Sequence, residues 1–360
     1  MKKIILIFLA VFIAGRAAAS QMRTAAANEL PAISVIGDLG LKVSSEDEEG
    51  LNNIAVRSVE FAYGGYLLPG LKTDIVFAAH GHDGELEFEV EEANITVISL
   101  FDNFGLKAGR ILPDIGKLNK IHAHHYPFTD RPLVMDRFLG GHGLIGDGVS
   151  INGLLPLPFF FQAEIGAYKI PEAHYHPEEG EEEEHNHDNE FSLADYAYTA
   201  KLWAGFAIGA DTEFELGISG VSARGPHYTV HKDNVKLAAV DMTIKSYFSA
   251  YQRLLFRTES FYLKRDLPSG FMENYGFYSY AGFTLDKYME IGARYGWSEN
   301  ALPKWSSKHE RDSRISGIFT YSFTESTKLR LQYNYFPEQE KHEGYAQFLF
   351  GIGPHSHPLE

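Results

Sequence analysis

The stretch KLRLQYNY, residues 328–335, changes the character of its side chains at every step. Basic and amide side chains occupy one phase, and leucines and tyrosines occupy the other. Successive side chains of an extended backbone point to opposite faces, so this pattern predicts a strand with one polar and one apolar face. The stretches YMEIGARYGW (288–297) and RISGIFTYSF (314–323) show the same alternation. The chain is therefore expected to be all-β.

Segments of about ten residues can be placed along the whole chain, separated alternately by short and long connections. Short links include residues 68–70, 155–158, 285–287 and 324–327, and long polar links include 44–50, 80–85, 172–190, 224–234 and 336–344. A soluble β-sandwich would share the alternation of side chains but not this alternation of connections. We predict a transmembrane antiparallel β-barrel of about 16 strands with both termini in the periplasm. The expected strands begin near Ala32, Arg57, Leu71, Leu86, Gly105, Ile145, Phe159, Asp195, Asp211, Val235, Gln252, Asn274, Tyr288, Arg314, Thr327 and Gly344.

One expected strand, residues 86–97, changes phase part-way along. Its apolar residues fall on even positions up to Val90 and on odd positions from Ala93 onward. An extra residue in one strand of an antiparallel pair shifts the phase by one step. We therefore predict a β-bulge near Glu91.

Residues 1–19 have the form of a secretory signal, in which two lysines precede an apolar run and three alanines. The run is too short for a membrane anchor, so we expect cleavage after Ala19 and a barrel formed by residues 20–360. Cleavage would remove three of the 32 basic residues and none of the 48 acidic ones. So acidic a chain excludes nucleic acid as a partner. The absence of cysteine excludes disulfides and thiolate metal sites.

The third long connection, residues 112–144, lacks clean alternation and mixes proline, glycine and aromatic residues. Its apolar residues are too numerous for a solvated segment: Phe128, Leu133, Val134, Met135, Phe138 and Leu139. Connections of this length are usually functional. We expect a third external loop that folds into the barrel and narrows the pore.

Two segments carry a family resemblance. GRILPDIGKLN (109–119) and the segment from His122 to Pro156, together with the C-terminal QFLFGIGPHSHPLE, resemble Gram-negative outer-membrane proteins grouped with the phosphate-selective porins. Histidine-rich members of that group carry zinc-regulated outer-membrane labels. The resemblance implies a sixteen-stranded porin in the outer membrane and passive diffusion of small solutes. It implies as partners outer-membrane lipid, lipopolysaccharide and the barrel assembly machinery, and leaves a homotrimer open.

One departure from many outer-membrane barrels lies at the C-terminus. The chain ends on Glu360 and not on an aromatic residue. Tyr345, Phe348 and Phe350 are expected to supply the aromatic assembly signal, followed by a short periplasmic tail.

Basic side chains fall on the phase that should face the lumen, mostly in the C-terminal half. A ring of such groups lowers the barrier for anions. The alternative is that they pair with carboxylates such as Glu259 and Glu290 and stiffen the wall. The expected pore-lining residues are Arg110, Lys117, Arg131, Arg253, Arg257, Arg294, Arg314, Lys328 and Arg330.

The chain has 16 histidines, many of them paired two residues apart. Residues i and i+2 of an extended backbone point the same way, and imidazoles with carboxylates suit Zn²⁺ and similar divalent ions. The richest segment, residues 171–191, is expected to be an external loop. The candidate metal ligands are His174, His176, His185, His187, Asp188, His80, His82, His122, His124 and His125. The alternative is that these pairs are solvated surface.

Catalytic motifs such as G-x-S-x-G and H-E-x-x-H are absent from the sequence, so we name no catalytic residues and do not expect an enzyme. The expected function is a porin-like channel for small ions or solutes, linked to divalent-metal uptake through the histidine-rich loops. No cofactor is required, although the loops could bind Zn²⁺. The alternative is a surface metal-binding or adhesive barrel with a closed pore, which conductance measurements would distinguish.

Overall fold

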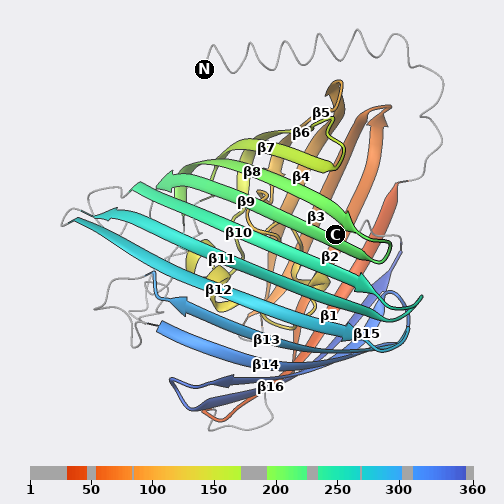
Figure 1. The fold of residues 1–360 in the computed structure, drawn as a ribbon, viewed down its shortest axis with the longest axis vertical. Helices are drawn as coiled ribbons and strands as arrows, with labels where there is room; N and C mark the ends of the chain where they lie inside the picture. Colours follow the sequence, from red (N-terminus) through yellow and green to blue (C-terminus); the bar gives the residue numbers. More distant parts are fainter. Residues whose placement is uncertain are drawn as a thin grey trace.

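The computed structural model describes residues 31–46, 54–82, 85–171, 193–224, 234–267, 270–301 and 311–353. These residues form a closed barrel in which every neighbouring pair of strands is antiparallel and β1 pairs with β16 (Figure 1). The strands are β1 (Ala32–Ser44), β2 (Ile54–Leu68), β3 (Leu71–His82), β4 (Glu85–Phe101), β5 (Phe104–Ile111), β6 (Gly146–Leu154), β7 (Phe160–Lys169), β8 (Ala194–Ile208), β9 (Thr212–Arg224), β10 (Asn234–Tyr247), β11 (Arg253–Leu267), β12 (Gly270–Thr284), β13 (Met289–Glu299), β14 (Arg311–Ser322), β15 (Thr327–Phe336) and β16 (Lys341–Ile352). The sixteen-stranded antiparallel barrel predicted from the sequence is confirmed. The expected signal peptide lies outside the described residues.

Two predicted connections are wrong in length. Residues 80–85 were expected to form a long polar link, but β3 continues to His82 and β4 begins at Glu85. Residues 336–344 were expected to form another, but β15 continues to Phe336 and β16 begins at Lys341. The strands therefore extend by several residues beyond the expected point. A strand end that projects above the lipid needs no apolar face, so polarity alone does not mark where it stops.

The two faces of the barrel wall differ in chemistry. In β15, Leu331 on the outer face is 45% exposed, whereas the next residue, Gln332, faces inward and is 3% exposed. Large apolar side chains on the outer face would be costly in water but are favoured in lipid. Among the described residues, neither helix is long and apolar enough to cross a membrane.

Aromatic side chains gather toward both ends of the strands. Near the short turns, the rings of Phe159 and Phe206 lie 4.7 Å apart between centroids, and Tyr288 stacks with Tyr321 at 6.0 Å. Toward the opposite end, Tyr262 and Tyr275 lie 5.1 Å apart, and Phe277 and Trp297 lie 6.3 Å apart. Two aromatic girdles of this kind mark the two interfaces of a membrane barrel.

The segment between β5 and β6, residues 112–145, folds into the barrel; we call it the inner loop. It is the golden segment enclosed by the strands in Figure 1. It contains the 3₁₀ turn η1 (Ala123–His125) and the short helix α2 (Leu133–Leu139), which contacts β12, β13 and β14. The predicted inward fold of the third long connection is therefore seen directly.

The β-bulge predicted near Glu91 is present. Val76 of β3 pairs with Glu92, and Phe77 pairs with Val90, so Glu91 is the extra residue of β4. After the bulge, inward and outward positions exchange parity, as the sequence pattern required. The result is that the consecutive residues Glu91 and Glu92 both reach the lumen.

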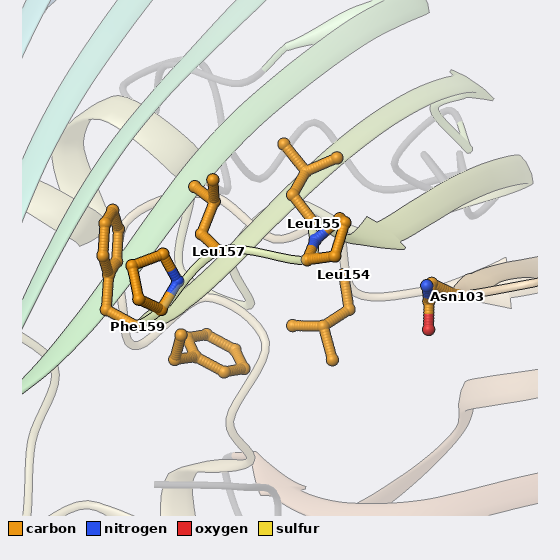
Figure 2. A pocket seen from close by; sticks show the side chains of 8 residues that line it. Asn103, Leu154, Leu155, Leu157 and Phe159 are labelled. Atoms are coloured by element: carbon orange, nitrogen blue, oxygen red, sulfur yellow. The ribbon is translucent and has the colours of Figure 1, made fainter.

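The described surface also has a shallow hollow at the short-turn end. It is lined by Asn103 and by the turn that joins β6 to β7, whose leucine and phenylalanine side chains surround it (Figure 2). The lining contains no charged side chain. This composition suits a position near the membrane interface better than a site for a polar ligand.

Candidate functional site

The inner loop rests on an apolar base. Phe128, Val134, Met135 and Phe138 are all fully buried, and Leu139 nearly so. The Phe128 ring packs edge-on against Tyr278 and Tyr280 of β12, with centroids 6.0 and 5.7 Å away. Burial of a side chain of this size contributes roughly 1.5–3 kcal/mol. The loop is therefore a packed part of the barrel interior.

Asp130 is the centre of an electrostatic clamp between the inner loop and the strands β13 to β15. Its carboxylate accepts hydrogen bonds from Arg294 at 2.5 Å and from Arg314 at 2.6 Å. Gln332 and Asn334 donate to the same carboxylate at 2.5 and 3.0 Å. Burial raises the pKa of Asp130, but the two guanidinium groups outweigh it and hold that pKa well below the usual range. Asp130 is thus a half-buried, charged anchor.

The beginning of the inner loop is fixed to β8 and β9. Asp114 accepts a hydrogen bond from the Lys201 ammonium at 2.5 Å, and Lys117 donates to Glu215, also at 2.5 Å. Burial lowers the pKa of Lys117 to about 8, although Glu215 opposes that change. These pairs attach the loop to a second part of the wall.

Glu259 of β11 binds the backbone of the same segment. Its carboxylate accepts hydrogen bonds from the backbone N–H groups of Lys117 and Leu118 at 2.8 and 3.2 Å, and from the Tyr278 hydroxyl at 2.5 Å. The loop backbone therefore has polar partners on the wall, which a buried irregular segment requires.

A cluster of histidines and carboxylates joins the loop to β2, β3 and β4; we call it the histidine–carboxylate seam. It consists of Glu60, His80, Glu91, Glu92, His122 and His124. The His122 ring contacts Glu91 through Nδ1 at 2.8 Å and Glu92 through Nε2 at 2.9 Å. His124 contacts Glu60 at 2.9 Å.

His122 is held as an imidazolium. Both of its ring nitrogens face carboxylate oxygens, which can only accept, so both nitrogens must carry a proton. Burial lowers the pKa of His122, but Glu91 and Glu92, followed by Glu60, raise it well above its ordinary value. The seam is therefore a charge-assisted attachment of the loop to the wall.

A second group lies beside the seam. His80 of β3, Glu89 of β4 and His142 of the inner loop each offer a ligand atom, and these atoms all lie within 4.8 Å of one another. Glu60, Glu91 and His122 of the seam meet the same distance criterion. Both groups combine residues of the wall with residues of the inner loop.

Several of the histidines expected as metal ligands come together here. His80, His122 and His124 lie in or beside the two groups, and the His125 ring lies 4.0 Å from that of His124. His82 is the last residue of β3, and its side chain is not among those described. The remaining candidates lie in residues 172–192, outside the described part of the chain: His174, His176, His185, His187 and Asp188.

Most of the basic residues expected to line the pore lie inward, either within the inner loop or covered by it. Fully or almost fully buried are Lys117, Arg257, Arg294, Arg314 and Arg330. Arg131, Arg253 and Lys328 are half-buried. The pairing of Arg294 and Arg314 with Asp130 favours the interpretation that these charges are neutralised and stiffen the interior. Alternation shows that a side chain points into the barrel. It does not show whether the inner loop covers that side chain or leaves it open to water.

Arg110 requires a correction, because it lies on the outer face. It pairs in register with Ala93 and Asp147, and its guanidinium donates to Asp147 at 2.8 Å. Lys107, three residues earlier and hence on the opposite face, reaches Glu92 in the lumen. Asp147 is in turn 49% exposed on its side chain. The inward position of Arg110 was predicted from its charge. Its position in the alternation of β5 puts it on the outer face.

Three of the carboxylates that hold the inner loop were not foreseen as site residues. Glu60, Glu91 and Glu92 lie on the inward side of their strands. A sequence signal was available in β4, where the predicted bulge brings two consecutive carboxylates to one face. Their partners on the loop could not be read from the pattern.

The barrel fold is shared with solved structures. The chain aligns with an anion-selective porin from Comamonas acidovorans with a TM-score of 0.56 at 11% identity, covering 90% of this chain and 100% of that one. Salmonella typhi OmpF in complex with daunomycin aligns with a TM-score of 0.57 at 9% identity, covering 89% and 97%. The trimer form of Vibrio cholerae OmpT gives 0.54 at 10% identity, covering 90% and 100%. The fold is that of an outer-membrane porin.

Sequence comparison adds one relative. The chain is 28% identical over 310 residues to an uncharacterized protein of Aquifex aeolicus, a match that covers 75% of this chain and 63% of that protein. The chain thus spans less than two thirds of this relative. No protein-family model matches the chain. The porin fold, the apolar outer face and the two aromatic girdles together place the protein in the outer membrane.

Proposed function

We propose that the protein is a channel for the passive passage of small ions or solutes, with the inner loop as its constriction. The observation that carries this proposal is the attachment of the loop to the wall at separated places, through Asp130, Lys117 and His122. A loop fixed in this way sets the width of the passage, because it cannot move aside without breaking buried ion pairs.

The charges beside the loop favour cations on one side of the interior. The arginines of β13 and β14 are occupied by Asp130. On β2 and β4, three carboxylates converge on the seam beside two positive charges, the His122 imidazolium and the Lys107 ammonium 3.1 Å from Glu92. Carboxylates at a constriction lower the barrier for cations. We therefore extend the proposal to divalent metal ions, in line with the histidine-rich segments of the sequence.

Conductance in planar bilayers tests the channel. Purified full-length protein should give steady single-channel steps in a simple salt, with a reversal potential in a salt gradient that indicates cation preference. A reversal potential set by the anion would contradict the cation preference while leaving the channel in place. Absence of any steps would contradict the channel itself.

A second candidate is a metal-binding or adhesive surface barrel with a closed pore. It is favoured by the same attachments, since the loop has partners on β2, β4, β8, β9, β11, β13, β14 and β15. A barrel that inserts into the bilayer and stays silent, but conducts once the inner loop is removed, would support this candidate. Porin-fold channels and this alternative both act without catalysis, so we propose no enzymatic activity.

A further inference from the structure

We propose that His80, Glu89 and His142 form a binding site for a divalent transition-metal ion, which joins the inner loop to the barrel wall. His80 and Glu89 belong to β3 and β4, whereas His142 follows α2 in the inner loop. The proposal names a metal site for the channel proposed above, but it rests on its own contacts. It therefore stands whether or not the barrel conducts.

The donor set matches the chemistry of such ions. Two imidazoles and one carboxylate are ligands that Zn²⁺, Ni²⁺ and Cu²⁺ accept, with a further position left for water. Bonds of about 2.1 Å in tetrahedral geometry separate the donors by about 3.4 Å. Here the three ligand atoms lie within 4.8 Å of one another, and His142 Nδ1 is 3.9 Å from Glu89 Oε2. Modest rotations of the side chains would close this set around an ion.

The environment permits an ion to arrive and keeps the ligands oriented. The side chains of His142 and Glu89 are 67% and 36% exposed, so the site opens to water. The His80 and His142 rings lie edge to face with centroids 5.4 Å apart. His80 also contacts Glu91 through Nε2 at 3.2 Å, and a carboxylate in this position commonly orients a metal-binding imidazole.

The neighbouring group of Glu60, Glu91 and His122 is a poorer metal site. The two nitrogens of His122 already face Glu91 and Glu92 at 2.8 and 2.9 Å. As an imidazolium, His122 has no lone pair to offer. A metal there would have to displace a proton and one carboxylate contact. The side chains of His80, Glu89 and His142, in contrast, are 25%, 36% and 67% exposed.

Cu²⁺ binding to the full-length chain without an affinity tag tests the site. The background carries His174, His176, His185, His187, His355 and His357 replaced by alanine, which removes three other pairs of histidines spaced two residues apart. Pulsed electron paramagnetic resonance should show two imidazoles on the bound Cu²⁺. His80→Ala or His142→Ala should leave one imidazole and weaken binding at least tenfold. Glu89→Gln should keep both imidazoles and also weaken binding at least tenfold.

His342→Ala is the matched control, because His342 lies in β16 and contacts Tyr333. It should change neither the spectrum nor the affinity. Heat-dependent migration in electrophoresis checks that each variant is a folded barrel. The proposal is overturned if Cu²⁺ does not bind, if the two-imidazole signal persists in both His80→Ala and His142→Ala, or if His342→Ala removes it equally. Bilayer conductance of the same samples reports separately on the proposed channel.

Discussion

Glu91 and Glu92 are consecutive in β4, yet their carboxylates hold opposite nitrogens of one imidazole, that of His122. In a regular strand two consecutive side chains point to opposite faces. The bulge at Glu91 removes this restriction, because it inserts one unpaired residue opposite β3. The bulge in β4 thus allows two consecutive carboxylates to bind His122 of the inner loop.

Deletion of Glu91 should restore a regular β4 while removing one of the two carboxylates that bind His122. Val90 would keep its outward position and Glu92 its inward one, so we expect the barrel to fold. The attachment of His122 should weaken by roughly 1.5–3 kcal/mol, the usual contribution of a hydrogen bond to a charged group. Single-channel current should become noisier, and Glu91→Gln, which keeps the bulge, should show a smaller effect. Equal current noise in the deletion and the wild type would contradict this account.

Asp130→Asn should be among the most destabilising single changes in the interior. It leaves Arg294 and Arg314 buried without a full counter-charge, which typically costs about 3–5 kcal/mol. The free energy of unfolding can be measured by urea titration of the barrel in lipid vesicles. Glu273→Gln is the control, since its pair with Lys264 is about one third exposed on each side chain and should contribute about 0–1 kcal/mol. Similar losses for both variants would remove Asp130 from its central role.

Acid should loosen the inner loop through the same carboxylate. The pKa of Asp130 is lowered in the folded protein, whereas an unfolded aspartate titrates near about 3.9. The folded state therefore gains stability from this group above about pH 4, and that gain is lost as the pH falls through the lowered pKa. Unfolding experiments below about pH 4 should show the loss in the wild type. Asp130→Asn should lack this component, and an identical pH profile in both would contradict the assignment.

Deletion of residues 119–138 should raise single-channel conductance severalfold. The deleted segment includes Phe128, Asp130 and His122, but none of the strand pairs that close the barrel. The wall should therefore persist, as heat-dependent migration in electrophoresis can show. An unchanged current would mean that the inner loop does not limit passage.

The histidine-rich segment gives a separate prediction. Replacing His174, His176, His185 and His187 with alanine should reduce the number of Zn²⁺ ions bound per chain in calorimetry, and binding by the wild type should weaken as the pH falls through about 6. Glutamine in place of Glu181 to Glu184 should have a smaller effect, because long-range attraction is screened by salt. The same Zn²⁺ stoichiometry in the four-histidine variant would leave this segment as solvated surface.

The barrel could be predicted from the sequence, because the pattern that specifies each strand lies within a few consecutive residues. The alternation of Leu331 with Gln332 reports which face meets lipid, and the change of phase after Val90 reports a bulge. Both features depend on neighbours in the chain. Phe128 and Phe138 could also be assigned to the interior, because a loop with so many apolar residues must bury them away from water.

The side-chain partners within the interior could not be predicted from the sequence, because they are separated by long stretches of it. Asp130 meets Arg294 across 164 positions, and Lys117 meets the Glu259 carboxylate across 142. Arg110 was predicted to face the lumen because it is charged. Its pairing with Asp147 shows that it lies on the outer face. The pattern identified which residues face inward but not which of them pair.

The attachments of the inner loop have a mechanical consequence for the barrel itself. Backbone hydrogen bonds join each strand only to its two neighbours, so a closed sheet resists stretching around its circumference more than it resists flattening. The inner loop binds Glu91 on β4 through His122 and Glu259 on β11 through the backbone of Lys117, and these strands stand nearly opposite in the ring. The loop therefore links two nearly opposite strands across the interior, and we expect it to resist flattening of the barrel under the lateral pressure of the surrounding lipid.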